Sequence, residues 1–420
     1  MRSIIRAVLA SAVIAALFTV TAGAAAASGG RHDDDRGTSH QHHHPAPPPP
    51  AHHQPGPPPS HHPGPPEHHH PGPPPPYRSE HPVFVQTDNT AGNQVIAYDQ
   101  GRDGSLTEVG AYATGGLGGE LEGSVVDHLA SQGSLAYDAE NGLLYAVNAG
   151  SDSVSVFAVS GDRLSLRQVI DSGGSFPVSV AVDHGLVYVL NAEAGGLLQG
   201  YRAAFGRLFP IPGSGRELGL DPTETPRFTH TPGQVTFSPD GSQVIVTAKA
   251  AGSTIDVFAV QAFGRLSTPV VNSEPGTVPF AATFDQAGDL IVSQAGTNAV
   301  TSYALHHDGT VTPLSTLATG QQATCWVVRS GSVVYASNAG SATLSDIGLG
   351  VGGQLSALGT TETSGGTVDA ALAANGRVLY VQGGAAGTVD TFSIGSGGAL
   401  TKVGTVTVPG AVGGEGIVAL

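Results

Sequence analysis

One short segment returns along this chain and restricts the folds that it can adopt. Residues 142–148 read Gly-Leu-Leu-Tyr-Ala-Val-Asn, an apolar strand that runs into a turn. Variants of the segment occur six more times at nearly even spacing, at residues 82–86, 185–191, 243–247, 289–294, 332–338 and 377–382. Self-similarity at a fixed period indicates a repeat architecture.

Three further strands accompany each copy of this segment. A strand with period-two alternation follows it, then a turn such as Gly104-Ser-Leu106 with a third strand, and then a short strand of small apolar residues. Glycine in these turns supplies the positive φ that hairpins need. Four strands per repeat of about 45 residues predict an all-β, seven-bladed β-propeller with four antiparallel strands per blade. The alternative is a β-solenoid, whose repeats are shorter and seldom contain two hairpins.

The predicted propeller covers residues 83–420, and its ends belong to one blade. The first copy is the second strand of its unit, and the chain ends after a lone strand of the small apolar type at residues 416–420. We therefore expect the C-terminal strand to pair with the N-terminal blade and to close the ring. Closure removes the open sheet edges that would invite aggregation.

Residues 1–27 are predicted to be a signal peptide. Arg2 and Arg6 precede an apolar run and a stretch of small residues that ends at Ala27. The run of about 14 residues is shorter than the roughly 20 that span a membrane. We expect a secreted, extracellular protein with no transmembrane segment after cleavage; association with the cell wall is an alternative. Cys325 is the only cysteine, so no internal disulfide can form.

Residues 28–82 are predicted to be a disordered linker rich in His and Pro. Such a composition cannot offset its ordering entropy by burial. Thirteen of the 18 histidines lie here, and imidazole is a good ligand for Zn, Ni and Cu. The linker is either a solvated spacer or a site that binds these metals loosely, and no cofactor is expected to be required. The candidate ligands are His42, His43, His44, His68, His69 and His70.

The net charge of −16 argues against nucleic acid as a partner, because phosphates need a basic surface. We expect a monomer whose partner is a small molecule or a component of the cell envelope.

Two long insertions are predicted to carry the functional site. Because antiparallel strands alternate in direction, the loops at residues 115–132 and 213–231 should leave the ring on the same face, and long loops on a rigid scaffold often carry function. A lactone or carboxylate ligand would need a proton acceptor and a charge partner. The candidate catalytic residues are His230, Arg227 and Glu224. The candidate ligand-binding residues are His128, Arg216, Lys249, Trp326 and Glu415. The alternative is that exposed loops are simply charged.

Several of the strands resemble those of a known family. The relevant segments are Gln234-Val-Thr-Phe-Ser-Pro-Asp-Gly241, Val244-Ile-Val-Thr-Ala-Lys249, Pro279-Phe280, Ala323-Thr-Cys-Trp-Val327 and Val334-Tyr-Ala-Ser-Asn-Ala-Gly340. Over residues 83–420 the chain resembles secreted bacterial members of the seven-bladed lactonase family, which includes 6-phosphogluconolactonases and carboxymuconate lactonising enzymes. The resemblance implies a propeller fold and a lactonase-like hydrolase or cycloisomerase activity. The family's His-Pro-His run is Thr231-Pro232-Gly233 here, with His230 beside it, so no catalytic role is transferred.

Three functions are consistent with these observations. The first is a module that binds a ligand or partner on the face with the two insertions. The second is a lactone hydrolase or cycloisomerase that uses His230, Arg227 and Glu224. The third is a structural protein of the cell envelope.

Overall fold

The structure, a computed structural model, describes residues 81–420. The predicted signal peptide and residues 28–80 of the predicted linker, with the six candidate metal ligands, lie outside the described residues. Within residues 81–420 no helix is long and apolar enough to cross a membrane.

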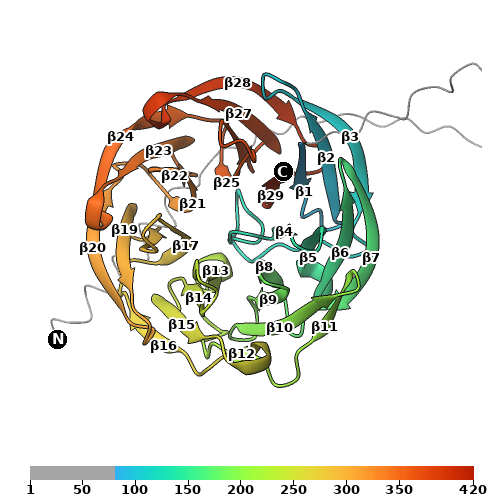
Figure 1. The fold of residues 1–420 in the computed structure, drawn as a ribbon, viewed down its shortest axis with the longest axis vertical. Coiled ribbons are helices and arrows are strands. Elements are labelled where there is room, and N and C mark those ends of the chain that lie inside the picture. The colour runs from blue at the N-terminus through green and yellow to red at the C-terminus, as the bar shows by residue number, and fades with distance from the viewer. Residues whose placement is uncertain (1–80) are drawn as a thin grey trace, which may run out of the picture. The chain divides into compact units, whose positions relative to one another are not determined.

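Seven antiparallel sheets surround a central axis and form a β-propeller (Figure 1). This confirms the predicted fold class. From the inside outward, the first four blades contain β29 (Ile417–Ala419), β1 (Pro82–Gln86), β2 (Gln94–Gln100) and β3 (Leu106–Ala113); β4 (Leu135–Asp138), β5 (Leu143–Asn148), β6 (Ser153–Ser160) and β7 (Arg163–Asp171); β8 (Pro177–Asp183), β9 (Leu186–Asn191), β10 (Leu197–Ala204), β11 (Arg207–Pro210) and β12 (Arg216–Glu217); and β13 (Pro232–Phe237), β14 (Gln243–Ala248), β15 (Thr254–Ala259) and β16 (Val270–Ser273).

The other three blades follow the same order. They contain β17 (Pro279–Phe284), β18 (Leu290–Gln294), β19 (Ala299–Leu305) and β20 (Val311–Ala318); β21 (Thr324–Ser330), β22 (Val333–Asn338), β23 (Thr343–Leu349) and β24 (Leu355–Glu362); and β25 (Thr367–Leu372), β26 (Val378–Gly383), β27 (Thr388–Ile394) and β28 (Leu400–Thr407). Short 3₁₀ turns complete the described elements: η1 (Ala149–Ser151), η2 (Arg227–Thr229), η3 (Ala262–Gly264), η4 (Val351–Gly353) and η5 (Ser396–Gly398).

The third blade differs from the others at its outer edge. Its outer strand is divided into β11 and β12, and both pieces pair with β10. Pro212 lies in the break and has no backbone N–H to donate to a ladder. The 213–231 insertion therefore begins at a natural interruption of the sheet.

The second strand of each blade forms the core. All residues of β5 and β22 are buried, whereas the side chains of the outer strand β7 are mostly exposed or half-buried. This pattern is the one expected for sheets packed face to face around a ring, with the outer edge in water.

A tyrosine on the second strand links several blades to the next one. Tyr335 Oη donates to Gly398 O at 2.7 Å, and Tyr188 Oη donates to Gly264 O. Gly398 has a φ of +84°, and a Cβ there would lie 2.6 Å from Val333 Cγ2. The glycine of the predicted Gly-x-Leu turns is thus required for its left-handed backbone and for the close approach of the neighbouring blade.

The C-terminal strand closes the ring as predicted. β29 pairs antiparallel with β1, in the register Val83↔Ala419, Phe84↔Val418 and Val85↔Ile417. Gln86 N donates to Gly416 O at 2.9 Å, and Leu420 N donates to Pro82 O at the same distance. The innermost strand of the first blade is therefore supplied by the last residues of the chain.

We predict that deletion of residues 414–420 abolishes cooperative folding, because the first blade would lose its inner strand and the seventh its neighbour. Val418→Pro should lower the melting temperature strongly, since proline removes a backbone donor from a ladder. Val418→Thr keeps that donor and is the control. Thermal denaturation followed by circular dichroism tests both, and an unchanged melting curve for the truncated chain would contradict the closure.

Candidate functional site

The 115–132 insertion turns inward and fills the centre of the ring. Trp326 Nε1 in β21 donates to Ser131 O at 2.6 Å, and Ser131 Oγ donates to Val178 O in β8 at 2.9 Å. Gln132 exchanges two hydrogen bonds with the backbone of Val327. Figure 1 shows this segment in the middle of the ring, between β4 and β25. One loop thus contacts blades on opposite sides of the axis.

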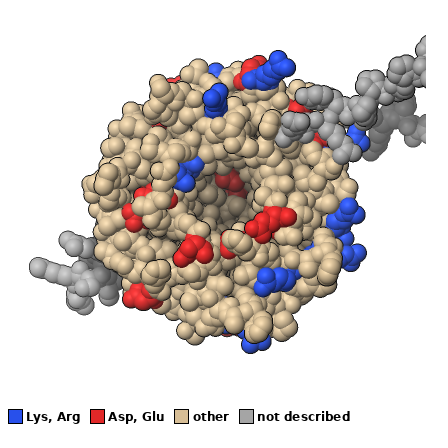
Figure 2. All heavy atoms as spheres, in the orientation of Figure 1, with Lys and Arg blue, Asp and Glu red and all other residues tan. Residues whose placement is uncertain are grey.

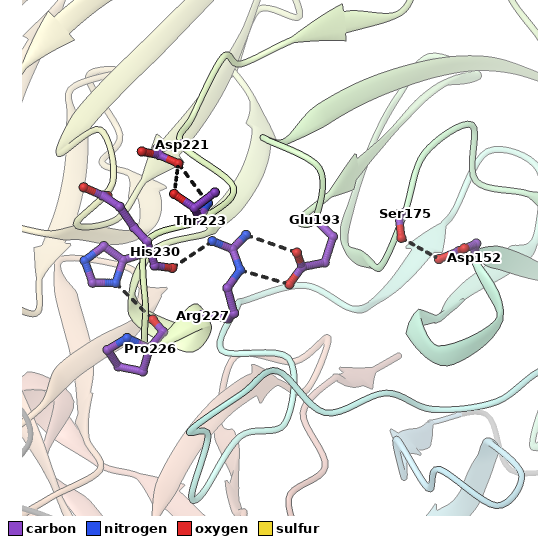
Figure 3. Close-up of polar contacts among 9 residues, drawn as sticks. Asp152, Ser175, Glu193, Asp221, Thr223, Pro226, Arg227 and His230 are labelled. Carbon is purple, nitrogen blue, oxygen red and sulfur yellow. Dashed lines mark hydrogen bonds and ion pairs between the residues drawn. The ribbon is translucent and has the colours of Figure 1, made fainter.

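The 213–231 insertion lies against the first insertion. Phe228 N donates to Glu122 O at 3.2 Å, so both loops leave the ring on one face, as predicted from strand direction. Arg227 holds the second loop in place. Its guanidinium donates to both carboxylate oxygens of Glu193, at 3.1 and 3.3 Å, and to Glu224 O at 3.0 Å (Figure 3).

A pocket of about 110 Å³ opens where the two loops meet blades four, five and six. We call it the Lys249 pocket. Its walls are largely apolar and come from both insertions and from the starts of β17 and β21. The apolar residues that line it include Val126, Ala130, Phe228, Val278, Phe280 and Trp326, and the polar ones include Asp127, Lys249, Asn298, Gln322 and Cys325.

Lys249 places an amine in this apolar pocket. The residue is 1% exposed, its Nζ donates to Ala130 O, and it lies 5.3 Å from the centre of the Phe280 ring. Among residues 81–420 no carboxylate oxygen lies within 4.0 Å of this nitrogen. Burial lowers the pKa of Lys249 to about 7. Neutral and protonated amine are therefore both present near neutral pH.

The corresponding position in other blades shows what is unusual about this lysine. Alanine occupies this position in other blades: the backbone N–H groups of Ala192, Ala295 and Ala339 donate to the residue before the innermost strand, as that of Lys249 donates to Thr231 O. The asparagine of such a turn, for example Asn338, lies one residue earlier, where the fourth blade has Ala248. Lys249 instead extends to the 115–132 loop. It is therefore a buried residue, although a lysine in a turn could equally have pointed into solvent.

Cys325 and Asp127 complete the polar part of the pocket. Cys325 is a free, buried cysteine, and burial raises the pKa of its thiol to about 12, so it stays protonated. Burial also raises the pKa of Asp127, although its carboxylate accepts hydrogen bonds from Leu129 N and Ser131 N. Lys249 is therefore the group in this pocket that can act as a nucleophile near neutral pH.

Buried carboxyl groups line the central channel beside the first insertion. Glu415 is fully buried, and its carboxylate accepts a hydrogen bond from Gly133 N at 2.7 Å. Glu415 N donates to Asp88 Oδ2 at 2.8 Å, and Asp369 is close enough to interact electrostatically with the Glu415 carboxyl. Burial raises the pKa of Asp88 to about 7 and raises those of Asp369 and Glu415. These groups hold protons well above the pH at which exposed carboxyls lose them.

The propeller face seen in Figure 2 is hollowed at its centre, and Asp and Glu side chains gather around the opening. An anion that approached this opening would meet carboxylates. Among residues 81–420, however, no group of three or more His, Cys, Asp or Glu side chains could hold a metal ion.

The three residues predicted to be catalytic do not line the Lys249 pocket. Arg227 is buried in its ion pair with Glu193, and Glu224 is exposed and binds Arg227 through its backbone carbonyl. His230 Nδ1 lies 3.0 Å from Pro226 O and 2.8 Å from Thr229 Oγ1, and its ring lies away from Glu193 (Figure 3). Arg227 orders the loop, and the three side chains do not converge on a common point.

The five residues predicted to bind ligand lie in three different places. Lys249 and Trp326 line the pocket, whereas Glu415 lies in the channel. Arg216 donates to Leu266 O and Ser267 O and thereby joins the third blade to the fourth. His128 is held by its backbone, which donates to Gly413 O at 2.8 Å.

Phe280, Cys325 and Asp127 line the pocket but were not predicted as site residues, and neither were Asp88 and Asp369 in the channel. Strand patterns present Phe280 and Cys325 as core residues. In the sequence, Asp127 is one of several acidic residues of the 115–132 insertion. Only the path of that loop through the ring places it against Lys249.

A comparison with models of protein families finds no match, and a comparison with curated proteins finds none. Solved structures do match. A Lactobacillus plantarum protein is 20% identical with a TM-score of 0.67, and the match covers 81% of this chain and 99% of that one. A "putative 6-phosphogluconolactonase" of Bacteroides fragilis is 18% identical, with a TM-score of 0.66 and coverage of 81% and 98%. The periplasmic gluconolactonase of Pseudomonas aeruginosa is 17% identical, with a TM-score of 0.66 and coverage of 81% and 99%.

The fold is the 6-phosphogluconolactonase-like seven-bladed propeller. The matches span nearly the whole length of these 6-phosphogluconolactonase-like proteins, so they share the complete ring with residues 81–420. At this level of identity the likeness concerns the fold and does not transfer site residues.

We predict that the free energy of unfolding falls as the pH rises from about 4 to about 7. Because burial raises the pKa values of Asp88, Asp369 and Glu415, the folded protein holds more protons than the unfolded chain in this window. Stability is highest at the acidic end and decreases as these groups lose their protons. Melting temperatures measured at about pH 5 and about pH 7.5 test the sign.

Glu415→Gln should reduce this pH dependence, because the amide keeps an acceptor for Gly133 N and does not titrate. We expect the difference in melting temperature between the two pH values to be smaller in this variant than in the wild type. Glu224→Gln, the same change at an exposed position, is the matched control. Equal pH dependence in both variants would contradict the role of the channel carboxyls.

Proposed function

We propose that the protein binds a small, mostly apolar molecule that carries a hydrogen-bond acceptor, in the Lys249 pocket. The observation that carries this proposal is the composition of the pocket, whose apolar walls surround one buried amine. Ligand sites are typically concave and apolar, with few well-placed polar groups. The Lys249 ammonium already donates to Ala130 O and has further N–H groups for a ligand.

The size of the pocket limits the ligand. An apolar cavity of about 150 Å³ takes a molecule of the size of benzene, so a pocket of about 110 Å³ suits roughly five carbon atoms. At about 0.8 kcal/mol for each buried CH₂ group, such a ligand gains on the order of 4 kcal/mol, which corresponds to millimolar affinity. A sugar lactone with several hydroxyls would leave most of its polar groups unpaired against these walls.

Trp326 allows a direct test, because it is the only tryptophan in the chain and lines the pocket. We expect 3-methylbutan-1-ol to change the Trp326 fluorescence in a saturable manner. Ala295→Leu adds volume at the pocket wall and should weaken binding at least fivefold. Ala262→Leu, at an exposed turn on the outer part of the fourth blade, is the matched control. A titration curve that is the same for both variants would refute binding in this pocket.

A second candidate function is hydrolysis of a small apolar lactone in the same pocket. It is favoured by the fold shared with the proteins named as gluconolactonases. The Lys249 ammonium would donate to the lactone carbonyl, and the Asp127 carboxylate would accept a proton from the attacking water. Hydroxide adds to the carbonyl carbon, the ring C–O bond breaks, and the proton taken up by Asp127 passes to the departing oxygen, which gives the hydroxy acid.

For the lactone reaction we predict that Lys249→Met loses turnover of γ-valerolactone at least tenfold, whereas His230→Ala retains it. The reason is that Lys249 lines the pocket and His230 does not. Acid release in a weakly buffered assay measures the rate. A loss confined to His230→Ala would restore the alternative with His230, Arg227 and Glu224, and no turnover by the wild type would exclude this substrate.

A further inference from the structure

Lys249 differs in its surroundings from the other lysine of the chain. The chain contains only two lysines, and the other, Lys402, is 41% exposed and ion-paired with Asp390 at 2.9 Å. Lys249 is buried, lines a pocket, and has no carboxylate of residues 81–420 within 4.0 Å to hold its proton. A desolvated amine of this kind is the group that proteins use to attack carbonyl carbon.

We propose that Lys249 captures small apolar aldehydes or ketones as an imine, which rests on the proposed function because the carbonyl compound must first enter the Lys249 pocket. The Nζ lone pair forms a bond to the carbonyl carbon, the C=O π electrons move to oxygen, and a proton passes from the nitrogen to this oxygen to give a carbinolamine. The nitrogen then loses its second proton, the C–O bond breaks, and one molecule of water leaves. The product is a C=N bond, and no oxidant or reductant is consumed.

The groups around Lys249 suit these steps. Asp127 from the first insertion, Cys325 from β21 and Arg227 from η2 are the titratable and charged groups that influence its charge. Burial keeps the Cys325 thiol protonated, so it does not compete as a thiolate. Asp127 is close enough to interact electrostatically with the amine, and its carboxyl can supply the proton that the departing hydroxyl needs. The apolar walls keep bulk water from hydrolysing the imine.

Reductive trapping with the full-length protein tests the proposal. The protein is incubated with 3-methylbutanal and cyanoborohydride, which reduces an imine to a stable secondary amine, and the adduct is located by peptide mass spectrometry. We expect adduct at Lys249 to form at least tenfold faster than at Lys402. The rate at Lys249 should rise as the pH increases through neutrality, because only the unprotonated amine attacks. Lys249→Arg should lose the adduct, and Lys402→Arg should keep it.

The alcohol with the same carbon skeleton separates this proposal from the proposed function. 3-Methylbutan-1-ol cannot form an imine, and it should slow trapping at Lys249 but not at Lys402. If the alcohol changes Trp326 fluorescence but the aldehyde is not trapped at Lys249, imine capture is wrong and ligand binding stands. If neither the alcohol nor the aldehyde affects Trp326 or Lys249, both proposals fail. Equal trapping at the two lysines, or trapping that the alcohol does not slow, also overturns imine capture.

Discussion

The pairing of β29 with β1 is the interaction on which the rest of the structure depends. Each blade is a small sheet that packs against its two neighbours, and a ring of such sheets is stable only when no blade lacks a neighbour. A second contact joins the same two blades: Tyr380 Oη in the last blade donates to Gly104 O in the first at 3.2 Å. With a single cysteine, the chain has no disulfide to hold its ends. Strand pairing and the tyrosine contact perform that role.

Closure also creates a central channel, and the way this channel is filled determines the electrostatics of the protein. The 115–132 loop crosses the channel, and the backbone N–H groups of Gly133 and Ser134, directly after the loop, donate to the Glu415 carboxyl. Carboxyl groups removed from water in this way favour their protonated form, because desolvation penalises the charge more than the hydrogen bonds stabilise it. The stability of the ring is therefore coupled to pH through buried residues and not only through exposed acids.

The sequence was sufficient to predict the fold but only part of the site. Strand periodicity and the glycines of the turns specify the blades, the number of blades and the pairing of the last strand. These three features depend only on the local sequence pattern and on the direction in which each strand runs. The common face of the two insertions follows from the same reasoning, and Phe228 N with Glu122 O confirms it. The path of a long loop is different, since it depends on contacts between residues far apart in sequence. Nothing local predicts that Ser131 meets Trp326, or that Arg227 is paired with Glu193.

The contrast between the channel and the pocket indicates which buried groups serve stability and which serve chemistry. Glu415 is anchored by backbone donors and can become neutral without losing its place, so its burial is explained by the architecture. Lys249 stands where other blades have Ala192, Ala295 and Ala339, and an alanine there would satisfy the fold. A lysine in that position costs desolvation of an amine and gains a hydrogen bond to Ala130 O and a contact with Phe280. A residue that departs from the repeat and is not required by packing indicates a functional role, and Lys249 contacts both insertions, through Ala130 O and Thr231 O.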